Sequence, residues 1–221
     1  MDLFSRSDFR IFELSGFAER MAAIRANIQP RLTSIGKALA PHLSSLVDVP
    51  LHVHVAKHMR RTVNPPDDTW AAFSRDPRGY KKDAHFRVSV SAQSVRFLFE
   101  AGPEYYEKSD WVRGWNRSFA TLAPDLQNGA ELCWFKDEHE DLPEKELKTL
   151  SEKEFRGLAR ELTRRKDGQF VLGRSIPTRE FLKLSSSEFE KLAIASFAPM
   201  APLFEVHKAR VLAKRGKMSG E

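Results

Sequence analysis

Between residues 51 and 101 the hydrophobic residues follow the pattern of short β-strands that succeed one another without a helix between them. Leu51, Val53 and Val55 alternate with other residues, which is the period of two expected of a strand that buries one face. Three further strands are predicted in this region, at residues 69–73, 85–90 and 94–101. Because parallel strands need long crossover connections, strands this close in sequence favour an antiparallel sheet, and the last two are predicted to form a hairpin.

Helical spacing of apolar residues is found on both sides of this block. It predicts an amphipathic helix over residues 17–28, a second helix that begins at Pro30, and a central helix over residues 104–122. Capping-box sequences at Ser151 and Ser185 predict two more helices, the first running through about Thr163 and the second near the C-terminus. Two more strands are predicted, at residues 129–135 and 169–176. The expected fold class is α+β, with a mainly antiparallel sheet of about five to six strands packed with N-terminal, central and C-terminal helices.

Length and composition favour one compact domain. The chain has 221 residues, of which 41% are hydrophobic, and we expect residues 1–213 to form the domain and residues 214–221 a basic, disordered tail. Cys133 is the only cysteine, so no internal disulfide can form, and the N-terminus lacks the pattern of a signal peptide. No stretch reaches the roughly 18 consecutive apolar residues that a membrane span needs. We therefore expect a cytoplasmic protein without a membrane segment.

Charges of opposite sign are unevenly distributed along the sequence, which has a formal net charge of +6. Residues 51–99 carry nine Lys and Arg against four Asp, and residues 161–221 carry twelve against seven acidic residues. Residues 100–160 carry nine against fourteen. This asymmetry predicts a positive face, which would attract phosphate-bearing ligands or nucleic acid. An ordinary solvated surface has the same composition, and charge alone favours that reading.

Residues 54–86 are the best candidate for a binding site, because cationic, histidine and aromatic side chains are crowded together there. Arginine offers a planar fork of donors and lysine a mobile charge, a combination that suits an anionic ligand with several oxygen atoms. Trp70 or Tyr80 would stack a ring, and the Asn-Pro-Pro turn at residues 64–66 would stiffen the connection. The predicted ligand-binding residues are His54, Lys57, His58, Arg60, Arg61, Asn64, Trp70, Arg78, Tyr80, Lys81, Lys82, His85 and, outside this segment, Arg174.

Histidines and carboxylates at two places raise the question of a metal site. His52 and His54 lie on one face of the predicted strand, and a His-x-His pair on a strand can bind zinc. A tetrahedral site needs further ligands, so a solvated polar strand face is favoured and no metal site is predicted. His139 and its acidic neighbours in residues 137–141 would allow an acid–base pair or a divalent cation, although such a run is more often a solvated loop.

Sequence motifs of several protein classes are missing. The chain has no Walker phosphate loop, no Gly-x-Gly-x-x-Gly after a strand, no Gly-x-Ser-x-Gly elbow and no Cys-x-x-Cys pair. These absences count against standard nucleotide-hydrolysing, dinucleotide-binding, serine-hydrolase and zinc-ribbon proteins, and the sequence leaves the cofactor unknown. Signatures of the common DNA-binding and RNA-binding modules are missing as well.

Three sequence motifs carry a family resemblance. They are H-V-A-K-H-x-R-R-T-V-N-P-P at residues 54–66, T-W-x-A-F at residues 69–73 and R-G-Y-K-K-x-x-H-F at residues 78–86. In these motifs the chain resembles the YktB-like family of uncharacterised bacterial proteins, and looser similarity extends over nearly its whole length. The resemblance implies a single compact α+β domain, cytoplasmic and soluble, with no established activity.

Three hypotheses about function follow. The leading one is a cytoplasmic binding domain with a cationic, aromatic-lined cleft for a phosphate-bearing small molecule, a nucleotide or a nucleic acid. The second is a hydrolase or transferase on a phosphorylated substrate, in which His58, His85 or His139 acts as general base. The third is a purely structural segment, whose cations pair with the net-negative middle of the chain. A cleft beside the cations would favour the first two hypotheses, and cations buried against carboxylates would favour the third.

Overall fold

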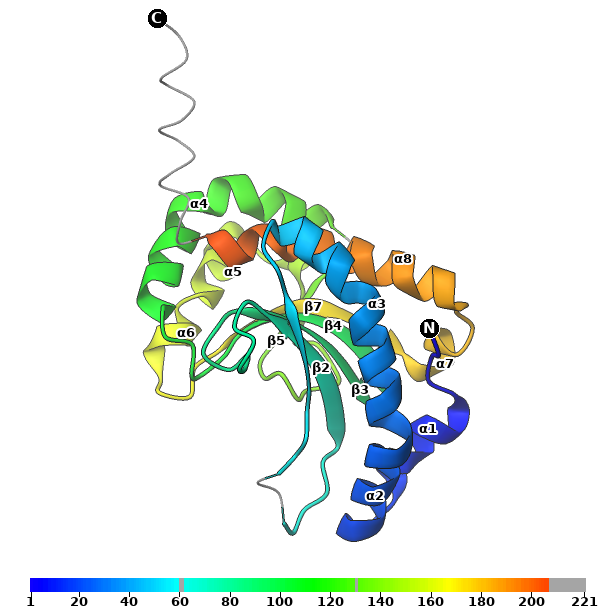
Figure 1. Ribbon diagram of the computed structural model, residues 1–221. Coiled ribbons are helices and arrows are strands. Elements are labelled where there is room, and N and C mark those ends of the chain that lie inside the picture. The colour runs from blue at the N-terminus through cyan, green and yellow to red at the C-terminus, as the bar shows by residue number, and fades with distance from the viewer. Residues whose placement is uncertain (60–61, 130, 207–221) are drawn as a thin grey trace, which may run out of the picture.

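The computed structural model describes residues 1–59, 62–129 and 131–206, and Figure 1 shows how their helices and strands are arranged. Seven strands in this part of the chain form one antiparallel sheet with the order β1-β2-β3-β4-β7-β5-β6. The strands are β1 (His52–Val55), β2 (Asp68–Ser74), β3 (His85–Ser91), β4 (Ser94–Ala101), β5 (Cys133–Phe135), β6 (Lys145–Glu146) and β7 (Phe170–Pro177). The α+β class is confirmed, but the expected count of five to six strands is wrong, because the two residues of β6 are too few to show an alternating pattern.

The helical segments of the described residues lie before, between and after the strands. They are α1 (Arg6–Arg10), η1 (Ile11–Glu13), α2 (Phe17–Ala23), η2 (Ile24–Ile28), α3 (Gln29–Val47), α4 (Lys108–Asn128), η3 (Leu147–Thr149), α5 (Glu152–Leu158), α6 (Glu161–Arg164), α7 (Thr178–Phe181), α8 (Ser186–Phe197) and η4 (Ala198–Glu205). Within the ranges that the structure describes, no helix is both long enough and apolar enough to cross a membrane.

The two helices predicted on either side of Pro30 form one continuous helical run. The π-helical turn η2 leads from α2 directly into α3, and Pro30 lies in the first turn of α3, where its missing N–H is tolerated. One side of this run is buried, and Ile28 and Leu32 have no solvent exposure. The run ends at Asp48, whose φ of 53° is left-handed.

Both predicted capping boxes are confirmed. The hydroxyl of Ser151 accepts a hydrogen bond from the backbone N–H of Glu154 at the start of α5, and Ser185 does the same for Glu188 at the start of α8. The helix expected to continue through Thr163 is divided into α5 and α6. The central helix α4 begins and ends later than the predicted residues 104–122.

Alternation along the strands gives the sheet one apolar face and one polar face. Helices α3, α4 and α8 lie over the apolar face, where the core forms (Figure 1). The ring of Phe86 in β3 lies 4.6 Å from the rings of Phe197 and Phe204, measured between centroids. The predicted hairpin is confirmed as β3 and β4, in which Val90 faces Val95. The opposite face carries polar residues and contacts the loop at residues 75–84 and the loop at residues 136–144.

Candidate functional site

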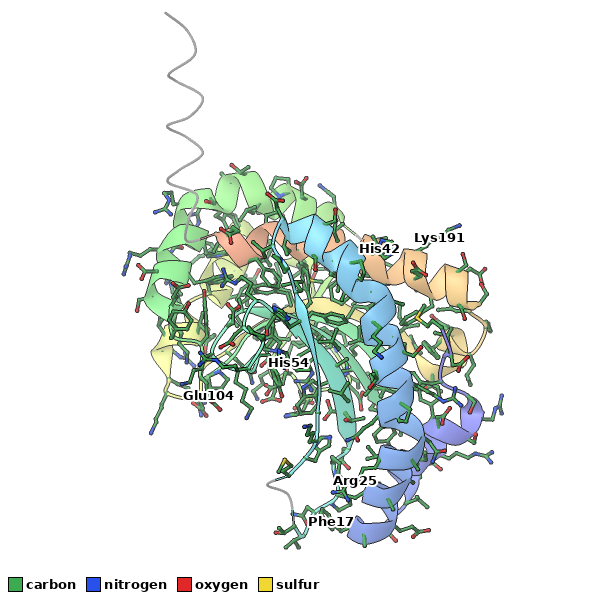
Figure 2. All side chains as sticks on the ribbon, in the orientation of Figure 1. Phe17, Arg25, His42, His54, Glu104 and Lys191 are labelled. Atoms are coloured by element: carbon green, nitrogen blue, oxygen red, sulfur yellow. The ribbon has the colours of Figure 1, made fainter. Side chains whose placement is uncertain are left out.

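A pocket of about 990 Å³ lies beside the end of β1, the loop that joins β2 to β3, and the segment that follows β4. Its lining contains five Lys and Arg against three acidic residues, and we call it the basic pocket. The lining residues are His54, Val55, Ala56, Lys57, Arg75, Asp76, Arg78, Gly79, Tyr80, Lys81, Lys82, Asp83, Glu104 and Tyr106. Figure 2 labels two of them, His54 and Glu104. Six predicted ligand-binding residues therefore share one pocket, namely His54, Lys57, Arg78, Tyr80, Lys81 and Lys82.

Arg75 is the most constrained cation of the basic pocket. Its Nε donates a 2.9 Å hydrogen bond to Oδ2 of Asp83, a second bond joins the same two side chains, and its Nη1 lies 3.4 Å from Oε1 of Glu205. The hydrogen bond that Arg75 donates to Asp83 is the main reason why the pKa of Arg75 is raised. Because its donors point at these carboxylates, Arg75 holds the pocket wall in place.

The other cations of the basic pocket are more exposed. Arg78 and Lys81 each face one carboxylate of the lining, with N–O distances of 3.5 Å and 3.4 Å. Lys57 and Lys82 are exposed, and neither forms an ion pair with a residue that the structure describes. These two ammonium groups are therefore available to an anionic ligand.

Tyr80 forms the aromatic part of the basic pocket. Its ring centroid lies 6.0 Å from that of His54, and its hydroxyl accepts a 3.1 Å hydrogen bond from Nε1 of Trp70. Burial lowers the pKa of His54, so this histidine is neutral at pH 7, and its Nε2–H donates to the carbonyl oxygen of Asp76 at 3.0 Å. Tyr106 adds a second ring, which is 70% exposed. Trp70 does not line the pocket, and its hydrogen bond holds the Tyr80 hydroxyl in position.

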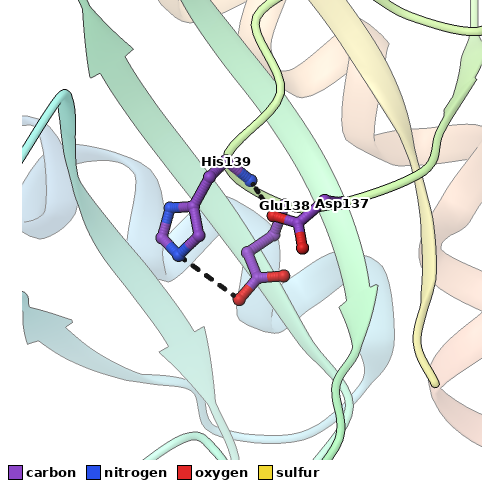
Figure 3. Close-up of side chains that lie close together, drawn as sticks. All are labelled: Asp137, Glu138 and His139. Atoms are coloured by element: carbon purple, nitrogen blue, oxygen red, sulfur yellow. Dashed lines mark hydrogen bonds and ion pairs between the residues drawn. The ribbon is translucent and has the colours of Figure 1, made fainter. Parts of the chain in front are cut away.

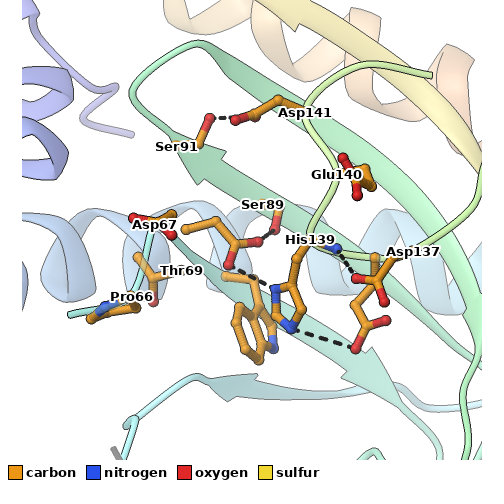
Figure 4. Close-up of polar contacts among 12 residues, drawn as sticks. Pro66, Asp67, Thr69, Ser89, Ser91, Asp137, His139, Glu140 and Asp141 are labelled. Carbon is orange, nitrogen blue, oxygen red and sulfur yellow. Dashed lines mark hydrogen bonds and ion pairs between the residues drawn. The ribbon is translucent and has the colours of Figure 1, made fainter. Parts of the chain in front are cut away.

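Asp68 is the centre of a buried charged network on the polar face of the sheet, part of which Figure 4 shows. Its carboxylate accepts hydrogen bonds from Nη2 of Arg87 at 2.8 Å and Nη2 of Arg96 at 2.9 Å. It also accepts bonds from Ser89 at 3.2 Å and from Nδ1 of His139 at 2.8 Å. Burial alone would raise the pKa of Asp68, but the charge of Arg87 and the bond from His139 outweigh burial and hold this pKa well below its usual value.

Glu100 extends this network toward the basic pocket. Its Oε2 lies 3.4 Å from Nη1 of Arg87 and 3.2 Å from Nε2 of His85. The guanidinium of Arg87 in turn lies 3.8 Å from the ring centroid of Trp70. The side chain of His85 is 1% exposed, and its Nδ1–H donates to the carbonyl of Asp83 at 3.0 Å. Both nitrogens of His85 thus face internal partners, and its ring packs 4.9 Å from that of Tyr80.

The loop after β5 is bound to the polar face, and Figure 4 shows some of these contacts. Asp141 accepts a 2.8 Å hydrogen bond from Ser94, and Arg96 donates to the carbonyl oxygen of Glu138 at 3.2 Å. Burial would lower the pKa of His139, but the hydrogen bond to Asp68 outweighs it and raises this pKa. The expectation of a solvated acidic loop is therefore wrong for His139 and Asp141, whose side-chain partners lie on distant strands, whereas Glu140 is exposed.

Asp137, Glu138 and His139 offer one ligand atom each within 4.8 Å, the kind of group that can hold a metal ion. Nε2 of His139 lies 3.6 Å from Oε1 of Glu138 (Figure 3). Both oxygens of Asp137 already accept hydrogen bonds of 2.8 Å, one from the backbone of His139 and one from Gln169. The acidic side chains here serve as acceptors within the protein.

The remaining predicted residues that the structure describes do not line the basic pocket. The strand β1 ends before His58, whose φ is 50° and whose Nε2 lies 2.9 Å from the hydroxyl of Thr69. Asn64 is exposed on the connection to β2. Arg174 lies in β7 and pairs with Glu131. Arg60 and Arg61 fall outside the described residues.

The buried charges of the polar face were not predicted from the sequence. The four central residues are Asp68, Arg87, Arg96 and Glu100. Arg87 and Arg96 do alternate with apolar residues along the two strands of the predicted hairpin. That alternation could have predicted their location, because it places both guanidinium groups on the face opposite Phe86 and Phe97.

A comparison with protein families matches residues 4–204 to the family described as "Domain of unknown function (DUF1054)". The chain belongs to this family. The match spans the strands and helices that build both the basic pocket and the charged network, so the two features lie within the family domain. The DUF1054 assignment agrees with the resemblance inferred from the motifs at residues 54–86.

Relatives of similar length occur in Bacillus species. A UPF0637 protein of Bacillus mycoides is 31% identical over 204 residues, which cover 92% of this chain and 97% of the relative. A UPF0637 protein of Bacillus cereus is 32% identical over 201 residues, which cover 91% of this chain and 95% of the relative. A UPF0637 protein of Bacillus anthracis shows 31% identity over 204 residues. The similarity therefore spans nearly the whole length of the Bacillus mycoides and Bacillus cereus proteins.

Proposed function

We propose that this DUF1054 chain is a cytoplasmic binding protein for a phosphate-bearing ligand, held in the basic pocket. The main support is the pair of exposed ammonium groups of Lys57 and Lys82. Both lysines line the pocket, and neither forms an ion pair with a described residue. The other cations of the pocket already face carboxylates. An incoming phosphate would therefore compete with no acidic side chain of the described residues for these two lysines.

The shape and chemistry of the basic pocket support a ligand of nucleotide size. Its volume of about 990 Å³ is at the upper end of typical small-molecule sites. Ammonium groups bind phosphate oxygens through charge-assisted hydrogen bonds, and the exposed guanidinium of Arg78 can add a two-point contact. The rings of Tyr80 and Tyr106 supply faces on which a base can stack.

Titration with phosphate-bearing probes at two ionic strengths tests this proposal. ATP, pyrophosphate and a single-stranded oligonucleotide would each be titrated by calorimetry at about 50 mM and about 200 mM salt. The expected result is binding of at least one probe, weakened at the higher salt because phosphate contacts release counterions. Absence of binding at both salt concentrations, or binding that salt does not change, would contradict the proposal. Comparison of the three probes would separate a small ligand from a nucleic-acid strand.

A phosphoester hydrolase or transferase is the second candidate, and the contact between Asp68 and His139 favours it. An ionised carboxylate that accepts from Nδ1 orients an imidazole and leaves Nε2 for proton transfer, as in other acid–base pairs. The side chain of His139 is 39% exposed, whereas that of His85 is 1% exposed. If turnover occurs, His139 is the favoured general base. A screen for phosphatase, phosphodiesterase and nuclease activity would compare wild type with His139→Ala and His85→Ala. Loss of activity in His139→Ala but not in His85→Ala would identify His139 as the general base.

The structural hypothesis makes the opposite prediction for both experiments. Arg75, Arg78 and Lys81 each pair with a carboxylate of the same pocket, as that hypothesis requires. It predicts no probe binding and no turnover. Binding by wild-type protein that depends on Lys57 or Lys82 would exclude it.

A further inference from the structure

A second pocket, of about 820 Å³, lies between β5, the loop that follows it, and helices α5 and α6. None of its lining residues belongs to the basic pocket. Six carboxylates and four Lys or Arg side chains line it, so its charge has the opposite sign. We call it the acidic pocket.

Most cations of the acidic pocket are neutralised by partners inside the lining. Ion pairs with N–O distances of 3.0 to 3.1 Å join Lys145 to Glu154, Arg164 to Glu161 and Arg165 to Asp167. Three carboxylates and one lysine remain outside these pairs. The pocket thus presents an excess of negative charge to whatever enters it.

The unpaired carboxylates come from the loop after β5. Glu140 and Glu144 are exposed, and neither forms an ion pair within the described ranges. Asp137 is fixed, because its Oδ2 accepts a 2.8 Å hydrogen bond from the amide nitrogen of Gln169. This bond determines the orientation of the Gln169 amide, since only its NH₂ group can donate to a carboxylate. Oε1 of Gln169 is buried and accepts no hydrogen bond from the described part of the chain, so the pocket lining contains an acceptor without a donor.

The acidic pocket also has an apolar wall. Trp134 of β5 is only partly buried, and Leu150 and Leu158 lie in the same lining. An indole face attracts a cation more strongly than any other side-chain ring, and leucine side chains accept a hydrocarbon chain. A ligand that matches all of these groups has positive charges at the carboxylates and an aliphatic body along the apolar wall.

We propose that the acidic pocket binds a small aliphatic polyamine, an organic cation with two or more ammonium groups. Glu140 and Glu144 would bind the ammonium groups, and Trp134 would contact the aliphatic chain or one of the charges. The proposal does not depend on the ligand of the basic pocket, because the two linings share no residue. A protein with both sites would recognise a polyanion and a polycation separately.

The test is a titration of the whole chain with spermidine at low salt, followed by calorimetry and by tryptophan emission. Wild-type protein should bind spermidine, and the double variant Glu140→Gln/Glu144→Gln should bind it about tenfold more weakly, since each exposed charge contributes modestly. The matched control Glu13→Gln/Glu19→Gln removes the same charge from exposed positions outside the pocket and should bind like wild type. The spermidine-induced change in emission should disappear in Trp134→Phe.

Two further measurements keep the result interpretable. Thermal unfolding and the binding of pyrophosphate should be unchanged in Glu140→Gln/Glu144→Gln, which shows that the fold and the basic pocket are intact. Absence of spermidine binding to wild-type protein would overturn the proposal. Equal spermidine binding by the wild type, the pocket variant and the control would overturn it as well, because the attraction would then come from overall charge.

Discussion

The indole N–H of Trp70 donates a 3.1 Å hydrogen bond to the hydroxyl oxygen of Tyr80, and this contact joins the basic pocket to the charged network on the polar face of the sheet. Tyr80 lines the pocket, while the ring of Trp70 lies 3.8 Å from the guanidinium carbon of Arg87. Arg87 in turn donates to Asp68. The position of the pocket wall is therefore linked to a buried carboxylate through three consecutive contacts.

Replacement of Asp68 should destabilise the fold strongly. Asp68→Asn leaves Arg87 and Arg96 buried with one carboxylate fewer, and loss of one partner of a buried ion pair costs about 3–5 kcal/mol. Chemical denaturation at pH 7 measures this difference in the free energy of unfolding. The control is Asp67→Asn, because the Asp67 side chain is 94% exposed and its ion pair with Arg20 should contribute less than about 1 kcal/mol.

The effect of Asp68→Asn should also depend on pH. The pKa of Asp68 is lowered in the folded state, so its stabilisation is fully present above the unfolded pKa of about 4 and is lost as pH falls toward the folded value. The difference between wild type and Asp68→Asn should therefore narrow below about pH 4. A difference that stays constant from neutral to strongly acidic pH would show that the carboxylate charge does not stabilise this network.

His139 and His54 should titrate on opposite sides of the usual histidine pKa. The bond to Asp68 raises the pKa of His139 above 6.5, whereas burial lowers that of His54 below 6.5. The stabilisation from protonated His139 is present below the unfolded pKa and is lost as pH rises through the folded one. NMR titration of the imidazole protons measures both values. In Asp68→Asn the pKa of His139 should fall, and an unchanged value would rule out the Asp68 contact as the cause.

Gly36→Ala and Gly157→Ala should change stability in opposite directions. A Cβ atom at Gly36 in α3 would lie 2.4 Å from Cγ1 of Val53 in β1, so the helix and the strand would have to separate. A Cβ atom at Gly157 in α5 has no neighbour within 4 Å. Alanine there should stabilise the helix by up to about 1 kcal/mol. Thermal unfolding of both variants checks this pair, and equal effects would contradict the close contact of α3 with β1.

The sequence predicts the positions of most strands, because each has an alternating pattern of its own and short connections to its neighbours. It also places Lys57 and Tyr80 in one binding segment, because they are close in the chain. The contact of Asp68 with His139 spans 71 positions and depends on where the loop after β5 crosses the sheet. No local pattern determines that crossing. The buried partners of the arginines were unpredictable for the same reason, as was the short strand β6, which is defined by its pairing with β5.

The most direct test of the basic pocket removes its two lysine charges that have no ion pair with a described residue. Pyrophosphate and ATP would be titrated into wild type, into Lys57→Gln/Lys82→Gln, and into the control Lys183→Gln/Lys191→Gln, whose lysines are exposed outside the pocket. We expect the pocket variant to bind at least about tenfold more weakly, a loss of about 1.4 kcal/mol, while the control retains wild-type affinity. Equal affinity of the three proteins, or an equal loss in both variants, would contradict the assignment of the phosphate site to the basic pocket.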